Sequence, residues 1–510
     1  MGPSPFPNLP DIDINIAGVT KLLKEIDPYK ATGPDGIPAK LLKEMADELS
    51  PSLALIFTAS LQQGEVPRDW KKALVTPLFK KGDQTNPTNY RPVSLTSICC
   101  KLLEHIIHSN VMSHLNAHKI ISDIQYGFRK RRSAELQLIC TIHDFACNLN
   151  EKKRTDAILL DFCKAFDKVS HRHLKLKLEY YGIRNKVLKW ISSFLQERTQ
   201  RVVCGGYTSD SENVISGVPQ GTVLGPLLFL IYINDLPECI SSMCSLFADD
   251  CLIYRKIESE RDIKILQNDF KNLELWAKKW LMTFNTDKCE VIQISLKPLT
   301  PNSYTLYGKY LKEVAEAKYL GVTIDCKLSF TKHIDIVCKK ANSTLAFIRR
   351  NLKSCQRQIK ADAYLLYVRP ILEYAAAVWA PHTRCDIERL EAVQRRAARF
   401  VMSNYNRASS VTKMLNDLNW NSLCNRRQTS RLSLLYKILH NLVDVTLPSY
   451  IVPSTVFTRG HDQKFILPQS RIDTYKFSFF PNSIRLWNNL PPETVYAHTI
   501  DKFCKLLIDN

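Results

Sequence analysis

The segment Ser245–Tyr254, SLFADDCLIY, restricts the fold more than any other part of the chain. Two short apolar runs flank the adjacent acidic residues Asp249 and Asp250, a pattern that predicts two strands joined at an acidic tip. Two neighbouring carboxylates repel one another unless cations offset their charge. The segment therefore predicts a β-hairpin whose tip either binds divalent metal ions or is an ordinary Asp-Asp turn.

A second carboxylate lies at the end of another predicted strand. Residues 157–161 read AILLD, a short apolar strand that ends at Asp161, and a helix-like stretch follows it. Carboxylates at the ends of neighbouring strands can converge on one pair of metal ions, as in sites for phosphoryl transfer. The alternative is an aspartate that caps the following helix, a role we expect of Asp167, which stands before VSHRHLKLKL.

A glycine-rich loop lies between these two segments. Residues 216–226 read SGVPQGTVLGP, and their glycines permit the backbone to approach a ligand closely. Gln220 carries an amide that can hydrogen-bond a base or a sugar. The alternative is a plain loop-to-helix turn with Pro226 at the first helical position, which accounts for the proline and leaves Gln220 unexplained.

The hydrophobic periodicity changes near residue 331. Strands and helices are mixed before this point, whereas after it a helical apolar stripe runs from Ile334 to Leu352 and no further strand is predicted. We predict an α+β fold. The expected helices cover 19–61 with a turn at 31–36, most of 91–150, 171–197, 259–281, 356–379 and 386–402, and the expected strands include 157–161, 202–203, 214–215, 291–295 and 319–324.

The order and spacing of these segments resemble the palm of reverse transcriptases, in particular those of non-LTR retrotransposons of the LINE, jockey-like group. DFCKAFDKV at 161–169, the 216–226 loop and FADD at 247–250 resemble motifs A, B and C. The resemblance extends over residues 20–510. It takes in ATGPDGIP at 31–38, NYRPVSL at 89–95, QYGFR at 125–129, residues 276–288, KYLGV at 318–322 and LWNNLP at 486–491.

The resemblance implies a right-hand polymerase with fingers, an antiparallel-sheet palm and a thumb. The implied segments are a loose N-terminus at 1–18, fingers with the start of the palm at 19–155, palm at 156–330, helical basic thumb at 331–430 and a C-terminal extension at 431–510. Asp161, Asp249 and Asp250 would be catalytic and would bind two Mg²⁺ together with the Phe162 carbonyl, with Mn²⁺ as a substitute. Lys288 would protonate the leaving pyrophosphate, with an ordinary exposed lysine as the alternative.

The resemblance also implies substrate contacts. Phe166 matches the aromatic gate under the sugar, where a bulky ring excludes a 2′-hydroxyl, and a core aromatic is the alternative. Solvated loop charges are the alternative for the basic residues that would hold the triphosphate. The implied substrate-binding residues are Phe162, Phe166, Gln220, Gly221, Arg91, Lys80, Lys81 and Arg129, and the implied primer grip is Tyr319, Leu320 and Gly321.

The charge of the chain suits a polyanionic partner. The formal net charge is +20, and residues 331–431 hold 19 Lys and Arg against 7 Asp and Glu. A basic face of this size suits nucleic acid, because each neutralised phosphate releases a counterion; a solvated face is the alternative. The resemblance implies an RNA template, a DNA primer or target DNA and dNTPs as partners, in the nucleus and cytoplasm.

Several classes of protein are not expected. The 16 cysteines form no C-x-x-C pair, so we expect reduced thiols rather than a zinc site or disulfides. The longest apolar run, LGPLLFLIYI, is too short to span a bilayer, and the N-terminus does not resemble a signal peptide, so no membrane association is expected. Residues 1–20 leave no room for the endonuclease that such elements usually encode, and we expect no zinc knuckle or RNase H part.

Two rival functions stay open at this point. One is a different palm polymerase, either RNA-copying or a group II intron-type maturase, against which Phe166 and the Ala-Asp-Asp sequence favour DNA synthesis. The other is a decayed or co-opted copy that binds RNA without catalysis. Decay should break the motifs, yet Asp161, Gln220, Asp249 and Asp250 are all present.

Overall fold

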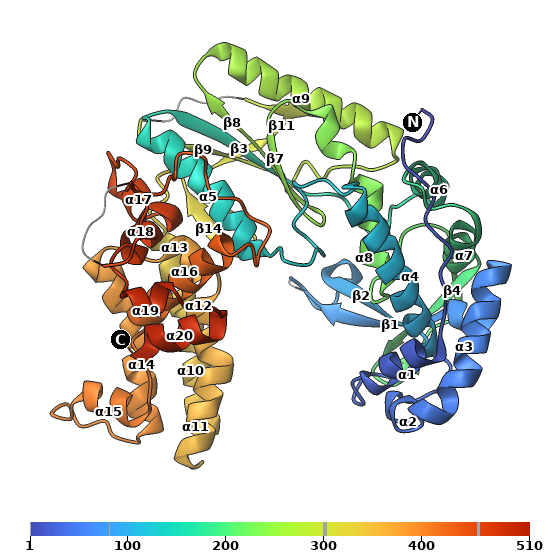
Figure 1. Ribbon diagram of the computed structural model, residues 1–510, viewed down its shortest axis with the longest axis horizontal. Helices are drawn as coiled ribbons and strands as arrows, with labels where there is room; N and C mark the ends of the chain where they lie inside the picture. The colour runs from blue at the N-terminus through green and yellow to red at the C-terminus, as the bar shows by residue number, and fades with distance from the viewer. Residues whose placement is uncertain (1, 81, 299–302, 456–459, 510) are drawn as a thin grey trace. The chain divides into compact units, whose positions relative to one another are not determined.

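The computed structural model describes residues 2–80, 82–298, 303–455 and 460–509 and is a mixed α+β fold (Figure 1). The chain divides into two compact units. The first combines the chain up to Phe128 with Asp161–Ser241 and Asn268–Thr286. The second combines Arg129–Leu160, Ser242–Gln267 and Asp287–Asn510.

The first unit is built around a sheet with strand order β2-β1-β4-β5, to which β6 adds by pairing with β4. β1 is antiparallel to β2 and parallel to β4. Helices α1, α3 and α7 pack in series, as do α7, α6 and α8. The elements are α1 (Ile16–Lys24), α2 (Ala39–Glu44), α3 (Ala46–Gln63), β1 (Lys72–Phe79), β2 (Tyr90–Leu95), α4 (Ile98–Ala117), α6 (His171–Tyr180), α7 (Asn185–Leu195), β4 (Arg198–Cys204), β5 (Tyr207–Thr208), β6 (Glu212–Val214) and α8 (Leu224–Ile233).

The second unit contains the sheet β12-β9-β3-β8-β7, in which β3 is the central strand. Neighbouring strands are antiparallel except β12, which is parallel to β9. Residues of β3 are buried on both faces, which is consistent with the apolar run at its end, and α5 packs against it. The elements are α5 (Ala134–Asn150), β3 (Arg154–Leu160), β7 (Met243–Phe247), β8 (Asp250–Ile257), β9 (Glu290–Ile294), β10 (Thr305–Leu306), β11 (Lys309–Tyr310), β12 (Lys312–Val314), β13 (Glu316–Tyr319) and β14 (Val322–Asp325); α9 (Glu260–Lys279) begins in this unit and ends in the first.

The rest of the second unit is helical. The predicted stripe is confirmed on α10, whose Ile334, Ala341 and Leu345 are buried and which packs against α14. A π-helical segment, Tyr364–Val368, joins α11 to α12. The helices are α10 (Thr331–Asn351), α11 (Arg357–Ala363), α12 (Arg369–Glu373), α13 (Ala376–Trp379), α14 (Arg384–Val401), α15 (Val411–Asp417), α16 (Leu423–Leu439), α17 (Asp473–Lys476), α18 (Phe479–Trp487), α19 (Pro492–Val495) and α20 (Ile500–Asp509).

The C-terminal residues form a core of their own and also pack on α5. Tyr436 of α16, Trp487 of α18 and Phe503 of α20 are members of one buried cluster. On α5, the buried His143 ring stacks on Tyr450 and lies edge-on to Phe480, with ring centroids 5.9 and 4.9 Å apart. The segment after residue 431 is therefore held to the sheet-bearing part of its unit by aromatic contacts.

Five local predictions are wrong. The expected strand over 319–324 is the end of β13, a turn at Leu320 and Gly321, and the start of β14. The expected helix over 171–197 is two helices, α6 and α7, with a turn between them, and the expected helix over 356–379 is broken into α11, the π-helical segment, α12 and α13. Asp167 does not cap α6, because Ser170 holds that position and its hydroxyl accepts from the His173 amide. Pro226 is not the first residue of its helix, because α8 already begins at Leu224.

In the described ranges of the chain, no helix is both long enough and apolar enough to cross a bilayer.

Candidate functional site

Asp249 and Asp250 lie at the tip of the β7–β8 hairpin in the second unit. Phe247 pairs with Asp250, so Ala248 and Asp249 alone form the turn. Ala248 has a φ of 52°, a backbone conformation that two-residue hairpin turns usually assign to glycine. Asp250 is exposed and Asp249 is half-buried, whereas the residues that follow in β8 are buried. The sequence prediction of an acidic hairpin tip is thus confirmed.

The end of β3 lies beside this hairpin in the same sheet. The pairing of β3 with β8 runs as far as Leu160, which is opposite Cys251. Asp161 is the next residue of the chain after Leu160 and is half-buried. Asp161 is therefore one residue beyond Leu160–Cys251, the last pair of β3 with β8.

Phe162 follows Asp161 in the first unit. Its buried ring stacks on Phe284, with centroids 4.4 Å apart. The Asn285 amide donates to the Asp161 carbonyl at 2.7 Å, and the Cys163 amide donates to the Thr283 carbonyl at 2.8 Å. Because these two bonds flank Phe162, its own carbonyl points to the opposite side of the strand. The ring is thus a core group, and only the carbonyl suits the predicted role as a metal ligand.

Phe166 lies in the turn after Asp161 and is half-buried. Its ring stacks on Phe229 of α8, with centroids 4.4 Å apart and planes 18° apart. It also meets Phe128 edge-on at 6.5 Å. A ring that is fixed on one side and partly accessible on the other suits a group that limits the shape of a bound sugar better than it suits a core aromatic.

The 216–226 loop is fastened to the turn that carries Phe166. The Val218 amide donates to the Phe166 carbonyl at 2.8 Å. Gly217 has a φ of +86°, and a Cβ at this position would lie 2.7 Å from the Asp167 Cα. A side chain here would push the loop away from the turn, so the close approach requires glycine.

The other side of this loop is fastened to β2. The Ser94 amide donates to the Gln220 carbonyl at 2.8 Å. A Cβ on Gly221 would lie 2.6 Å from the Ser94 carbonyl oxygen. The Gln220 side chain, expected to contact a ligand, donates from Nε2 to Asp167 Oδ1 at 3.3 Å. Asp167 and Gln220 are thus one hydrogen-bonded pair that orients the amide.

A cavity of about 380 Å³ opens beside the loop within the first unit. Its walls come from β1, β2, β4 and the loop itself. They include Val75, Pro92, Asp167, Gln200, Val218 and Gln220. Of the predicted substrate-binding residues that the structure describes, Gln220 alone lines it.

Two of the predicted triphosphate-binding residues lie on the β1–β2 hairpin. Arg91 pairs with Leu78, and the Lys80 amide donates to the Asn89 carbonyl at 2.9 Å. In an antiparallel pair, this register places the exposed Lys80 and Arg91 on one face as diagonal neighbours. Lys81 lies outside the described residues.

Tyr319, Leu320 and Gly321 form the turn between β13 and β14, but the Tyr319 side chain is buried. Its hydroxyl accepts a hydrogen bond of 2.6 Å from Gln137 of α5, and burial raises its pKa well above the usual value. The Leu320 carbonyl accepts from the Tyr374 hydroxyl at 2.9 Å. The Tyr319 side chain is therefore a core group, and a contact of this residue with a primer would have to use its backbone.

The other two predicted residues have less informative surroundings. Lys288 is exposed in the turn before β9. Arg129 is half-buried at the start of the second unit. Their proposed roles rest on the resemblance.

Sequence reasoning missed Glu104 of α4. It is fully buried, and its Oε2 accepts from the Val223 and Leu224 amides at 2.8 and 2.9 Å. Burial raises the pKa of this carboxyl, while the two backbone amides oppose that rise. Glu104 thereby caps α8, which carries Phe229. The available signal was one acidic residue inside the apolar stretch ICCKLLEHII.

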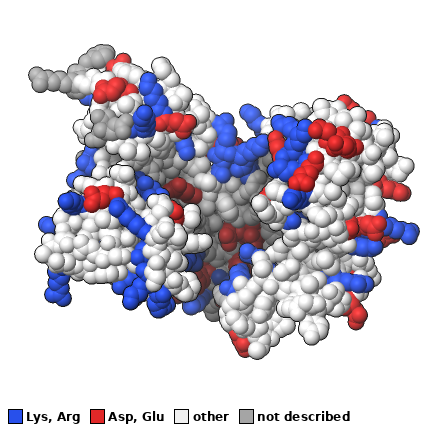
Figure 2. Space-filling model, turned by 90° about the horizontal axis from the view of Figure 1, so that it is seen from below, with Lys and Arg blue, Asp and Glu red and all other residues white. Residues whose placement is uncertain are grey.

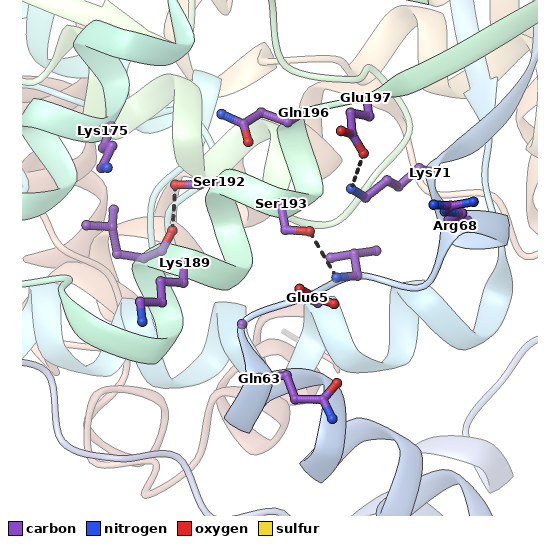
Figure 3. A pocket seen from close by; sticks show the side chains of 13 residues that line it. Gln63, Glu65, Arg68, Lys71, Lys175, Lys189, Ser192, Ser193, Gln196 and Glu197 are labelled. Atoms are coloured by element: carbon purple, nitrogen blue, oxygen red, sulfur yellow. Dashed lines mark hydrogen bonds and ion pairs between the residues drawn. The ribbon is translucent and has the colours of Figure 1, made fainter.

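A different cavity in the first unit, of about 560 Å³, contains none of the predicted site residues (Figure 3). The end of α3, the following loop and α7 form its walls. Lys71 pairs there with Glu197 at 3.5 Å, and the Val66 amide donates to Ser193 Oγ at 3.0 Å. Lys71 and Glu197 thus neutralise one another, and we do not include this cavity in the candidate site.

The carboxylates at the hairpin tip are of the right chemical type for a hard divalent cation, but they are too few to hold one alone. Carboxylate and carbonyl oxygens are the ligands that Mg²⁺ prefers, and Mg²⁺ is usually held by one or two carboxylates plus substrate phosphates. Among the described residues, no three His, Cys, Asp or Glu side chains group into a metal cage. A metal here would thus depend on a bound nucleotide to complete its ligands.

The sequence of this chain is similar to those of known proteins. The profile of the family described as "Reverse transcriptase (RNA-dependent DNA polymerase)" matches residues 79–324. The chain is 28% identical over 432 residues to "Probable RNA-directed DNA polymerase from transposon BS" of Drosophila melanogaster, covering 80% of this chain and 47% of the relative. It is also 28% identical over 412 residues to "RNA-directed DNA polymerase from mobile element jockey" of the same species, covering 78% and 45%.

The matched region contains nearly all of the candidate site. Residues 79–324 run from the end of β1 through the Phe166 turn, the 216–226 loop and the hairpin tip to β14. The chain spans about half the length of the curated relatives it matches. Residues 79–324 are therefore a reverse transcriptase domain, and the chain is a relative of the jockey and other non-LTR retrotransposon RNA-directed DNA polymerases.

Proposed function

We propose that this chain is an RNA-directed DNA polymerase of a non-LTR retrotransposon that extends a DNA primer on an RNA template with dNTPs. The observation that carries the proposal is the register of β3 with β8. The pair Leu160–Cys251 is the last of the ladder, and one further step along each strand leads to Asp161 and Asp250. Asp161 and Asp250 are thus each the next residue of the chain beyond that last pair, and Asp249 precedes Asp250 in the hairpin turn.

Asp161, Asp249, Asp250 and the Phe162 carbonyl would hold two Mg²⁺, or Mn²⁺ in their place. When bound, such ions lower the pKa of the primer 3′-hydroxyl and neutralise charge on the triphosphate. The protein then has mainly to position its substrates. Lys288 would give a proton to the leaving pyrophosphate from its exposed position before β9.

The first unit would bind the incoming nucleotide. Lys80 and Arg91, on one face of the β1–β2 hairpin, suit the triphosphate, since arginine can bind phosphate through two parallel hydrogen bonds. Phe166 would lie under the sugar and exclude a 2′-hydroxyl. Gln220 and Gly221 would lie beside the template base, in a loop held at both sides by backbone hydrogen bonds.

The helices of residues 331–430 would form the thumb, the 156–330 segment the palm and residues 19–155 the fingers with the start of the palm. A basic helical surface binds the backbone of an RNA–DNA hybrid by charge and shape without reading its sequence. The backbone of the Tyr319–Gly321 turn would support the primer, and Arg129 would contact the template or the triphosphate. The class of protein suggests a location in the nucleus and cytoplasm.

Primer extension on an RNA template with dNTPs and Mg²⁺ tests the proposal. The variants are Asp249→Asn and Asp250→Asn, and the matched control is Asp210→Asn, an exposed aspartate near the β4–β5 hairpin. Wild type and the control should extend the primer, whereas each tip variant should lose extension by at least about 100-fold. A DNA template and ribonucleotides serve as parallel substrates.

The rival functions give different results in this assay. A co-opted RNA-binding protein would bind the template, and wild type and the tip variants would extend equally poorly. An RNA-copying polymerase would prefer ribonucleotides to dNTPs. Either result would overturn the proposal.

A further inference from the structure

A basic cavity of about 610 Å³ lies at one end of the helical part of the second unit. Its walls come from the end of α10, from α11 and from the end of α14 with the turn that follows. Among the described residues that line it, none is acidic. The charged and aromatic lining residues are Arg349, Arg350, Lys353, Lys360, Phe400 and Tyr405.

Lys360 is the most buried of the basic residues that line this cavity. The residue is 5% exposed, and its Nζ donates to Ser403 Oγ at 3.0 Å and lies 5.4 Å from the centre of the Phe400 ring. A buried ammonium is costly unless an anion offsets its charge. No described carboxylate lies within the 4.0 Å ion-pair distance of Lys360. The cavity thus contains a buried cation that lacks an anion from the protein.

The neighbouring cations of the same helices are paired differently. Lys339 and Arg389 both contact Asp335, at 2.8 and 2.7 Å, and Arg395 contacts Glu388 at 2.6 Å. The exposed Arg349, Arg350 and Lys353 at the rim of the cavity have no such carboxylate among the described residues. Basic side chains gather over this helical part, at the left of Figure 2. Four basic side chains without a carboxylate partner among the described residues thus line this one cavity.

One wall of the cavity is aromatic. Tyr405 is 55% exposed, and the Arg349 guanidinium lies 5.5 Å from the centre of its ring. Ser403, which accepts the hydrogen bond from Lys360, has a φ of 50°, in the left-handed region that favours glycine. The turn that bears Ser403 and Tyr405 is therefore held in an unfavourable backbone conformation while it presents a hydroxyl to Lys360 and a ring to solvent.

We propose that this cavity binds one nucleotide of a single-stranded RNA, with the phosphate held by Lys360, Arg350 and Lys353 and the base stacked on Tyr405. A cationic cavity suits a phosphodiester, and an exposed ring suits an unpaired base, whose faces are free to stack. A base inside a duplex offers no free face. The inference rests on the RNA substrate of the proposed function, but it needs neither metal nor catalysis.

Fluorescence anisotropy with a labelled oligouridine of about eight nucleotides tests the site in EDTA and without dNTPs. The variants of the full chain are Lys360→Met, Arg350→Ala with Lys353→Ala, Tyr405→Ala and Tyr405→Phe. The matched control is Lys339→Ala, because Lys339 lies on α10, as Arg350 does, but is paired with Asp335. Thermal unfolding of each free protein accompanies the binding curves.

Lys360→Met should weaken RNA binding by about 10- to 100-fold and make the dependence of affinity on salt less steep by about one phosphate. The free variant should be at least as stable as wild type, because it no longer buries an unpaired charge. Tyr405→Ala should weaken binding by roughly 5- to 100-fold while Tyr405→Phe retains it. Lys339→Ala should bind like wild type.

If Lys360→Met binds RNA with the affinity and salt dependence of wild type, the phosphate site is overturned, whatever the stability of the free variant. An equal loss in Tyr405→Ala for an RNA–DNA hybrid duplex would overturn the stacked base. Displacement of the RNA by inorganic phosphate at an equal concentration of phosphate groups would assign the site to free phosphate. Failure of any of these leaves primer extension and its dependence on Asp249 intact, so the two proposals fail separately.

Discussion

The backbone amide of Val218 donates a hydrogen bond of 2.8 Å to the carbonyl oxygen of Phe166. This bond joins the loop at 216–226 to the turn after Asp161, two segments about fifty residues apart in sequence. Gly217, next to Val218, lies so close to Asp167 that no side chain fits between them. The position of the proposed sugar gate is thus set by the backbone of the glycine-rich loop.

Gly217→Ala should therefore reduce primer extension by about 100-fold, the cost of displacing reacting groups by about 1 Å. The new Cβ would lie 2.7 Å from the Asp167 Cα and separate the loop from the turn. Steady-state extension kinetics and thermal unfolding check this. Gly206→Ala is the control, since Gly206 has a nearly equal φ of +85° but no atom within 4 Å of the added Cβ. Equal effects of the two substitutions would show that backbone strain alone, and not the contact, matters.

Phe166→Val should admit ribonucleotides. Removing the ring removes the surface that would exclude a 2′-hydroxyl, and the ratio of kcat/KM for a dNTP to that for the matching ribonucleotide should fall about 10- to 200-fold. Phe229→Leu removes the ring that stacks on Phe166 at 4.4 Å but leaves the gate itself. That variant should lose efficiency with both nucleotides and keep most of its selectivity. An unchanged ratio in Phe166→Val would contradict the gate.

Features that depend on local sequence were predictable. The β7–β8 hairpin and the central strand β3 pair with one another in one sheet, and α5 packs against β3 and β7, so their apolar residues are buried. The α10 stripe follows from its contact with α14. In these elements, the spacing of the apolar residues along the chain indicates which residues are buried.

Features that depend on distant partners were not predictable in this way. The sequence predicts a strand at Tyr319, but it does not indicate that Gln137, 182 residues away, donates a hydrogen bond to the tyrosine hydroxyl. Glu104 is an acidic residue in an apolar stretch, but its partners, the Val223 and Leu224 amides, are 119 and 120 residues away. A buried polar group is determined by its hydrogen-bond partner, and the spacing of residues along the chain does not reveal that partner.

Glu104→Leu should destabilise the first unit, because it leaves the Val223 and Leu224 amides without their acceptor. Each unsatisfied buried amide costs about 1–3 kcal/mol, and α8 would lose its cap beside the 216–226 loop. Glu104→Gln retains an acceptor oxygen and should be much milder in urea unfolding. The prediction also covers activity, since the KM for dNTP should rise in the leucine variant. Equal stability of the two variants would mean that the cap contributes little.

His143 should make the stability of the second unit depend on pH. Burial lowers its pKa from 6.5 to about 4, and its ring nitrogen hydrogen-bonds the Tyr450 hydroxyl. Between these two values the unfolded chain binds more protons than the folded chain, so the stabilisation is complete above pH 6.5 and is lost as the pH falls towards 4. Relative to His143→Gln, wild type should lose on the order of 3 kcal/mol across this range. Urea unfolding of both proteins from pH 7 to pH 4 measures the difference. His333, whose pKa burial also lowers to about 4, is present in both proteins and cancels. A difference that stays constant with pH would show that His143 is protonated as easily in the folded protein as in the unfolded chain.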